Sequence, residues 1–177
     1  MNQLLSIVIC VLLISACGGS SDLGSNTPTG DKVANTNVAS QFQGGVALSD
    51  ANSQNTPNAI DEQNTTFWMS ESGVPLVIKF EVVERIQTIT LRKNAATVNR
   101  GSNPDIVVEL SLDGLAWKKS AITNAAAADV PCTATSASST HIECNMNAYS
   151  AQYLRITSQN GRTYEFAEIE ALTFHQQ

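Results

Sequence analysis

The chain has few basic residues. Ten Lys and Arg stand against sixteen Asp and Glu among 177 residues, which gives a formal net charge of -6. The basic residues are thinly spread, and only Arg85, Arg92, Lys93 and Arg100 come close together. Duplex binding requires a basic surface that neutralises phosphates. We therefore expect no nucleic-acid partner.

Long apolar runs are also missing, apart from Leu4 to Ile14, which only Ser6 interrupts. This run is shorter than the about twenty residues that span a bilayer, and its length suits the apolar core of a secretory signal. A buried helix or strand is the alternative, but the run has no polar face and stops at a Gly/Ser stretch. We predict a signal peptide over residues 1–16.

The sequence Leu13-Ile14-Ser15-Ala16-Cys17 resembles a bacterial lipobox. It implies a diacylglyceryl group on Cys17 and cleavage before it, although Met1-Asn2-Gln3 lacks the usual Lys or Arg. More than one acyl chain, at roughly 0.8 kcal/mol per buried methylene, anchors a protein stably. Gly18 resembles an outer-membrane sorting signal. Residues 17–32 are polar and predict a flexible linker, followed by a domain over residues 33–177.

Four cysteines are present, and two of them belong to the leader and the anchor. The remaining pair, Cys132 and Cys144, predicts a disulfide in an exported domain. His141 between them allows an alternative metal site with three ligands. Structural zinc normally takes four ligands, so we favour the disulfide.

Short β-branched runs dominate the rest of the chain, and no amphipathic helix stands out. A charged turn at residues 83–85, Asp113-Gly114 and Asn160-Gly161 separate several of these runs. Their spacing predicts a β-sandwich or barrel. The predicted strands are residues 77–82, 86–91, 105–112, 116–119, 152–157 and 165–172.

The segment Asn58 to Trp68 holds short oxygen-bearing side chains followed by two aromatics. Its polar half can bring carbonyls and a carboxylate onto calcium, which takes about six to eight oxygen ligands, while Phe67 and Trp68 fix the turn to the core. An Asx-type surface turn is the alternative. Alternation along the last strand points Glu168 away from the core and adds a carboxylate.

Four segments resemble, in order, a discoidin domain, also called a coagulation factor V/VIII C-type domain. The similarity covers residues 33 to 174 approximately and is closest to bacterial carbohydrate-binding modules and fucose-binding lectins. It implies a β-sandwich of jelly-roll type with a structural calcium. The segments are Asn58–Asp61 with Thr66–Ser70, Ser111–Trp117, Tyr153–Ile156 and Ala167–Glu170.

The resemblance also implies a calcium site: main-chain oxygens of Asn58, Gln63 and Ala167, carboxylates of Asp61 and Glu168, and an oxygen of Thr66. The family usually has Gly where this chain has Glu62, and Asn or Asp where it has Gln63. A glycine position can require φ > 0. Calcium would keep both carboxylates ionised and leave no acid for glycoside hydrolysis. No Gly-x-Ser-x-Gly elbow is present either, so we expect a non-catalytic protein.

Sugar sites in such modules lie among the loops at one end. The candidates here are Arg92, Asn94, Arg100, Asn103, Asn160, Arg162 and Tyr164. Arg92 and Arg100 are alternatively solvated charges, and Tyr164 is alternatively a packing aromatic. Trp68 and Trp117 are expected in the core. The predicted function is surface-anchored glycan capture or adhesion. The alternative is a module that docks an envelope protein.

Overall fold

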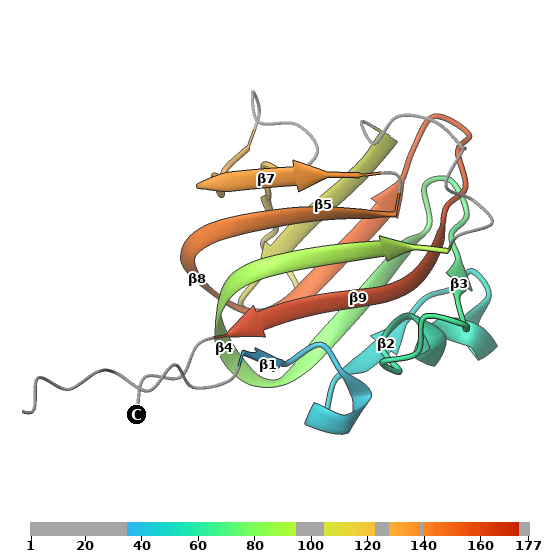
Figure 1. Cartoon of the computed structure of the whole chain (residues 1–177), viewed down its shortest axis with the longest axis horizontal. Helices are drawn as coiled ribbons and strands as arrows, with labels where there is room; N and C mark the ends of the chain where they lie inside the picture. Colours follow the sequence, from blue (N-terminus) through green and yellow to red (C-terminus); the bar gives the residue numbers. More distant parts are fainter. Residues whose placement is uncertain (1–34, 95–104, 123–127, 139, 174–177) are drawn as a thin grey trace, which may run out of the picture. The chain divides into compact units, whose positions relative to one another are not determined.

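The computed structural model describes residues 35–94, 105–122, 128–138 and 140–173, which contain nine β-strands and two 3-10 helices joined by turns and loops (Figure 1). All of them belong to one compact unit, Lys32–Gln177. The all-β sandwich expected from the strand pattern is confirmed. The elements are β1 (Thr36–Asn37), η1 (Gln41–Gln43), β2 (Val46–Leu48), η2 (Ser53–Ala59), β3 (Trp68–Met69), β4 (Pro75–Lys93), β5 (Ile106–Ser111), β6 (Lys118–Lys119), β7 (Ala134–Ala137), β8 (His141–Ser158) and β9 (Glu165–Thr173).

The strands pair in the order β1-β9-β4-β8-β5-β6, with β2 added to β4, β3 to β9 and β7 to β8. Every named pairing is antiparallel. Figure 1 shows β4 and β8 as long, curved strands. The first half of β4 pairs with β2, and its second half pairs with β9. Both halves pair with β8, so these two strands contribute to both layers of the sandwich.

The predicted turn at residues 83–85 is wrong, because β4 continues through it as one strand. The register between β4 and β8 shifts between Lys79 and Glu84, as at a β-bulge. A bulge bends a strand and increases its twist. Val82 and Val83 are exposed at this bend. The charged residues therefore mark the passage from one layer to the other.

The core lies between the two layers and is lined by alternating residues of the long strands. Ile78 and Phe80 in β4, Leu154 in β8 and Ile169 in β9 are all fully buried. Each such side chain contributes about 1.5–3 kcal/mol through burial. Trp68 is also fully buried and stacks on Phe166, with 6.2 Å between ring centroids. The core assignment of Trp68 is confirmed.

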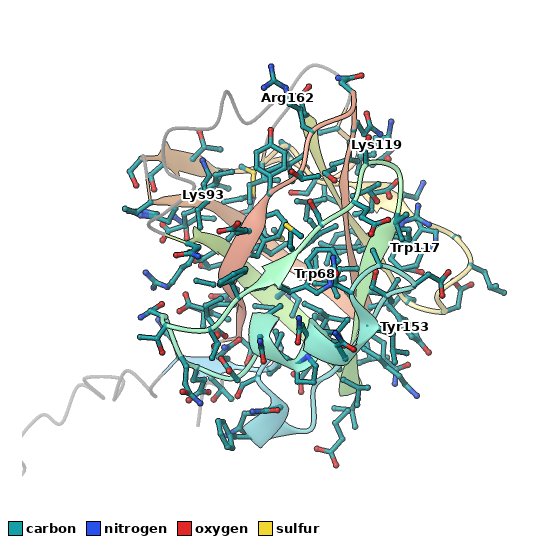
Figure 2. All side chains as sticks on the ribbon, turned by 90° about the vertical axis from the view of Figure 1, so that its right-hand side faces the viewer. Trp68, Lys93, Trp117, Lys119, Tyr153 and Arg162 are labelled. Carbon is teal, nitrogen blue, oxygen red and sulfur yellow. A yellow bond between two sulfur atoms is a disulfide. The ribbon has the colours of Figure 1, made fainter. Side chains whose placement is uncertain are left out.

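Two other aromatics of the predicted motifs, Phe67 and Trp117, lie outside the core. Trp117 is half-buried, and the Arg155 guanidinium carbon lies 4.1 Å from its ring centroid. Figure 2 shows Trp117 near the edge of the molecule and Trp68 near the centre. The core assignment of Trp117 is therefore wrong. Phe67 is 38% exposed, so Trp68 alone fixes the turn to the core.

Cys132 and Cys144 form the predicted disulfide, with 5.4 Å between their Cα atoms. It joins the segment before β7 to Cys144, a fully buried residue in the first half of β8. The alternative metal site of Cys132, His141 and Cys144 is wrong, because the two cysteine sulfur atoms are bonded to each other. His141 Nδ1 instead lies 3.0 Å from Ser138 Oγ.

Cys17, the signal peptide and the linker lie outside the described residues. In the described ranges, no helix combines the length and apolar character needed to cross a bilayer.

Candidate functional site

Residues 58–68 and Glu168 form a compact polar arrangement, which we call the clasp. Asn58 is in the last turn of η2, and its Nδ2 donates to the Phe67 carbonyl at 3.2 Å. Glu168 lies on β9, which also pairs with β3 through Trp68 and Phe166. The clasp therefore connects an early loop to the last strand, as the sequence predicted for these two elements.

Asp61 organises the loop part of the clasp. Its Oδ1 accepts a hydrogen bond from the Gln63 amide at 3.0 Å, which is the Asx-turn geometry, and its Oδ2 accepts from the Thr66 hydroxyl at 2.7 Å. The same hydroxyl lies 3.1 Å from the Gln63 carbonyl oxygen. Asp61 is buried, although it belongs to a loop. The Asx turn is thus present, and it brings carboxylate, hydroxyl and carbonyl oxygens together.

Glu168 is the most deeply buried acid of the clasp, with 3% of its surface exposed. Its Oε2 accepts a hydrogen bond from the Glu62 amide at 2.9 Å, whereas its buried Oε1 has no partner in the described structure. Burial raises the pKa of Glu168 to about 8, and the nearby charges of Glu170, Asp61 and Glu62 act in the same direction. An unpaired buried oxygen is costly, so a hydrogen-bond donor, a proton or a cation at this atom would stabilise the clasp.

Glu62 has the left-handed backbone that its glycine-like position implied, with a φ of 61°. A residue with a side chain adopts this conformation at a cost of roughly 1–2 kcal/mol. Its amide nevertheless reaches Glu168, so the departure from glycine leaves the clasp closed in this structure.

A hard cation fits the clasp better than a metal held by side chains alone. Within the described ranges, no three His, Cys, Asp or Glu side chains are grouped to hold a metal. Oxygen ligands from the main chain, together with Asp61 and Glu168, are the type of donor that calcium uses. The unpaired oxygen of Glu168 is the structural observation in favour of such an ion.

A groove of about 410 Å³ lies beside the clasp. It is lined by amides, carboxylates, one guanidinium and one aliphatic side chain, contributed by the N-terminal segment, the clasp loop, β4 and β9. The lining residues are Asn35, Asn37, Glu62, Asn64, Arg92, Glu168, Glu170 and Leu172.

Arg92 is the cation of this groove. Its Nε lies 2.9 Å from Oε1 of Glu170, and its second donor, a terminal nitrogen, lies 3.1 Å from Oε2. This bidentate pair raises the pKa of the Arg92 guanidinium. Asn94, the next sugar candidate along the chain, binds elsewhere: its Nδ2 donates to Glu165 Oε2 at 2.9 Å. Arg92 and Asn94 are therefore held by different carboxylates of β9.

Three further sugar candidates, Asn160, Arg162 and Tyr164, lie around Asp105. Asn160 Nδ2 donates to Asp105 Oδ1 at 2.7 Å, and Arg162 Nε lies 3.7 Å from Oδ2. Burial and Asp105 raise the pKa of the Tyr164 phenol. Figure 2 places Arg162 at one extremity of the molecule. We call Asp105, Asn160 and Arg162 the loop-end cluster.

Tyr164 differs from the other members of this group in its burial. It is 4% exposed and stacks on Phe166, with 6.2 Å between ring centroids. It therefore packs as a strand-end aromatic, which was the alternative at this position. Arg162, by contrast, has 59% of its side chain exposed. Arg100 and Asn103 lie outside the described residues.

Sequence reasoning missed two acids that organise these candidates. Glu170 shares the outward face of β9 with Glu168, so strand alternation was a usable signal for it. Asp105 begins the predicted strand after the candidate loop, but nothing in the sequence shows that Asn160 and Arg162 converge on it. That convergence depends on the layer arrangement, since Asp105 and Asn160 are 55 positions apart.

No protein-family model matches the chain, and no curated protein matches it. Solved structures do match. A family 32 carbohydrate-binding module (CBM32) from Clostridium perfringens is 14% identical, with a TM-score of 0.56, covering 80% of this chain and all of that one. The family 32 module of C. perfringens NanJ, solved with galactose, is 14% identical, with a TM-score of 0.56 and coverage of 79% and 100%.

A chitosan-binding module from a Paenibacillus chitosanase/glucanase is 16% identical, with a TM-score of 0.57 and coverage of 79% and 100%. Other matches are parts of larger enzymes, such as a Ruminococcus gnavus fucosidase of which the match covers 27%. The described part of this chain therefore has the jelly-roll β-sandwich fold of the family 32 carbohydrate-binding modules.

Proposed function

We propose that this chain is a non-catalytic carbohydrate-binding module, stabilised by calcium and anchored to the bacterial cell surface through Cys17. The observation that carries the binding function is the loop-end cluster. Two sequence-predicted candidates, Asn160 and Arg162, converge there on the Asp105 carboxylate, and the Arg162 side chain remains mostly exposed.

The loop-end cluster has the chemistry that sugar hydroxyls require. A binding site for a small ligand combines a few converging polar groups with restricted mobility. Asp105 restricts Asn160 through a hydrogen bond and Arg162 through an ion pair, and the Arg162 side chain remains mostly exposed. Relatives of this fold have been solved with galactose and with N-acetylgalactosaminyl-β-1,3-galactose. A glycan is accordingly the ligand class for this cluster.

Calcium has a structural role in this proposal. Asp61, Thr66 and Glu168, together with the carbonyls of Asn58, Gln63 and Ala167, would hold the ion. Bound calcium would supply positive charge to two buried carboxylates. Asp61 and Glu168 would then stay ionised and fasten the clasp loop to β9, which is why neither acts as a general acid.

The anchor rests on the lipobox-like sequence before Cys17. A diacylated cysteine followed by a polar linker would hold the module near a membrane, with an outer-membrane or cell-surface location. In that position the module serves adhesion or glycan capture. Metabolic labelling with a fatty-acid analogue tests this, because Cys17→Ala should abolish labelling.

A glycan array probed with the full-length protein, in calcium and in chelator, tests the binding function. We expect a restricted set of glycans to bind, with binding lost in Arg162→Ala and retained in Arg85→Ala, which changes an exposed arginine in the middle of β4. An empty array, together with capture of an envelope protein, would replace this function with protein docking.

A further inference from the structure

Exposed apolar side chains gather at one end of the β-sandwich, which we call the apolar end. Nine large apolar side chains are exposed in the described part of the chain, and five of them lie on only three segments. Single exposed apolar residues are common on protein surfaces, whereas a group of them marks a contact surface. The five are Phe42 in η1, Val82 and Val83 in the bend of β4, and Leu112 and Leu115 in the turn after β5.

The three segments are neighbours in the fold, although they are far apart in sequence. A Cβ placed on Gly44, which ends η1, would lie 3.1 Å from the Cβ of Glu81, next to the bend of β4. A Cβ placed on Gly114, in the turn after β5, would lie 3.6 Å from the Tyr153 ring. Tyr153 in turn pairs with Ser111, the last residue of β5, and with the part of β4 just before the bend. The five apolar side chains therefore belong to one end of the sandwich.

The turn that carries Leu115 is fixed by its own hydrogen bonds. Asp113 Oδ1 accepts from the amides of Leu115 and Ala116, at 2.8 and 2.9 Å. Ser111 Oγ accepts from the Gly114 amide at 2.9 Å. Leu115 is nevertheless 85% exposed, so little of its side chain packs on the domain. A fixed backbone that presents an apolar side chain to water loses little further freedom when a partner covers it.

The first strand of the domain also lies at the apolar end. Thr36 in β1 pairs with Thr173 in β9, and Thr173 pairs with Ile86, three residues after Val83. In Figure 1, β1 and the end of β9 lie next to the bend of β4. The chain between Cys17 and Thr36 can span at most about 65 Å. A lipid on Cys17 would therefore hold the apolar end within reach of the membrane.

The loop-end cluster lies at the other end of the sandwich. Asp105 directly precedes β5 and Leu112 directly follows it, and the six residues of this strand correspond to about 20 Å. In Figure 2, Arg162 lies at the top of the view and Tyr153 in its lower half. With the apolar end on a membrane, the loop-end cluster would face away from the lipid.

We propose that the apolar end contacts the bilayer to which the chain is anchored, with its five apolar side chains in the interfacial region of the lipid. The contact rests on the proposed lipid anchor, and it orients the loop-end cluster outward. Interfacial binding grows with buried apolar area and with attraction to anionic lipid. Exposed charges of both signs are present at this end, so the charge of the lipid should matter little. They are Lys79, Arg85, Glu81 and Asp113.

Quenching of tryptophan fluorescence by brominated lipid tests the contact. The lipidated protein is reconstituted into vesicles of phosphatidylethanolamine and phosphatidylglycerol, with and without brominated phosphatidylcholine. Leu115→Trp and Phe42→Trp each place a reporter at the apolar end, and Thr163→Trp, at an exposed residue beside Arg162, is the matched control. We expect bromine to reduce the emission of both reporters beyond the loss seen in the wild-type protein, and to leave the control at the wild-type loss. Replacing phosphatidylglycerol with phosphatidylcholine should not change the result.

A further variant separates a specific contact from tethering alone. Leu112→Ser combined with Leu115→Ser removes two exposed apolar side chains, so the fold should be retained. In the Phe42→Trp protein, these two changes should reduce the quenching, because less apolar surface holds this end on the lipid. Leu48→Ser, at an exposed leucine of β2 outside the apolar end, should leave the quenching unchanged. Full quenching in the double variant would show that the anchor alone brings this end to the membrane, and would overturn the proposed contact.

The remaining outcomes separate the contact from the anchor. Protein that does not float with the vesicles contradicts the anchor, and the contact with it. Protein that floats without quenching at either reporter leaves the anchor standing and overturns the contact. Equal quenching of the two reporters and of Thr163→Trp shows that the domain has no preferred orientation. Sedimentation as a dimer, lost in the double serine variant and accompanied by no quenching, assigns the apolar end to a second copy of the chain.

Discussion

Glu168 Oε2 accepts a hydrogen bond from the main-chain amide of Glu62, 106 positions earlier in the chain, at 2.9 Å. The Glu168 side chain thus fixes the backbone of Glu62, while the other carboxylate oxygen of Glu168, Oε1, is buried and has no partner in the described structure. The bond joins the early loop directly to the last strand. The stability of the domain should therefore respond to whatever neutralises Glu168.

Calcium removal should lower the melting temperature. A ligand that binds only the folded state stabilises it by about 2.7 kcal/mol at a concentration of 100 times its Kd. For a domain of this size, that corresponds to roughly 5–10 °C. Differential scanning fluorimetry in excess chelator measures the shift, and Asp61→Ala should reproduce it in calcium. An unchanged melting curve, with no metal found by elemental analysis, would remove calcium from the proposal.

The metal-free protein should lose stability as the pH rises. The pKa of Glu168 is raised in the folded state to about 8, above the ordinary value of 4.5. Folding therefore favours the protonated acid, and this contribution is complete below pH 4.5 and is lost as the pH rises through 8. The size of the effect is on the order of a few kcal/mol.

Urea unfolding in chelator between pH 4.5 and 9 checks this dependence. Glu168→Gln keeps the shape of the side chain and cannot ionise, so its unfolding free energy should vary much less over this range. A wild-type curve parallel to that of Glu168→Gln would show that Glu168 does not titrate in this way.

Glu62→Gly should stabilise the protein. The left-handed backbone at φ 61° costs a residue with a side chain roughly 1–2 kcal/mol, whereas glycine adopts it freely. Part of this gain is offset, because glycine loses more conformational entropy on folding. We expect a net gain of about 0.5–1 kcal/mol in the unfolding free energy. Glu71→Gly, at an exposed acid without a positive φ, is the matched control and should destabilise. Equal losses in the two variants would argue against strain at Glu62.

The two tryptophans should differ in their effect on stability. Trp68 is fully buried, and its Nε1 donates to the Ala51 carbonyl at 3.0 Å, so Trp68→Leu should cost about 3 kcal/mol or more. Trp117 lies at the surface under Arg155, where a cation–π contact is worth about 0.5–1 kcal/mol, so Trp117→Leu should cost far less. Chemical unfolding of both variants measures the difference. Similar losses of unfolding free energy in the two variants would indicate that Trp117 is a core residue.

The sequence predicted what local periodicity and short motifs determine. Alternation along residues 165–172 gave β9 and the outward side of Glu168, and two cysteines in an exported domain predicted the disulfide. The sequence did not predict how strands that are distant in the chain pair with one another. Residues 77–91 contain two β-branched runs with charges between them, which is typical of a hairpin. In the folded chain, neighbours on both sides keep β4 continuous.

The same limit applies to the candidate sites. Asp61 was proposed from the oxygen-rich loop and Glu168 from strand alternation. The resemblance added the full calcium ligand set, which stays a prediction. Glu170 and Asp105 depend on partners 78 and 55 positions away. Trp117 was misplaced, because the position of an aromatic after a turn does not show which side of the layer it faces. Its ring instead contacts the guanidinium of Arg155, which lies 38 positions later in the chain.

β1 and β9 close the domain in a way that affects how it can be joined to other proteins. Thr36 and Thr173, in the first and last strands, are direct partners. The chain therefore enters and leaves at one point of the β-sandwich. A neighbour fused on either side would start from the same edge, and the whole fold could be inserted into a surface loop of a host protein without forcing the two flanking segments of the host apart.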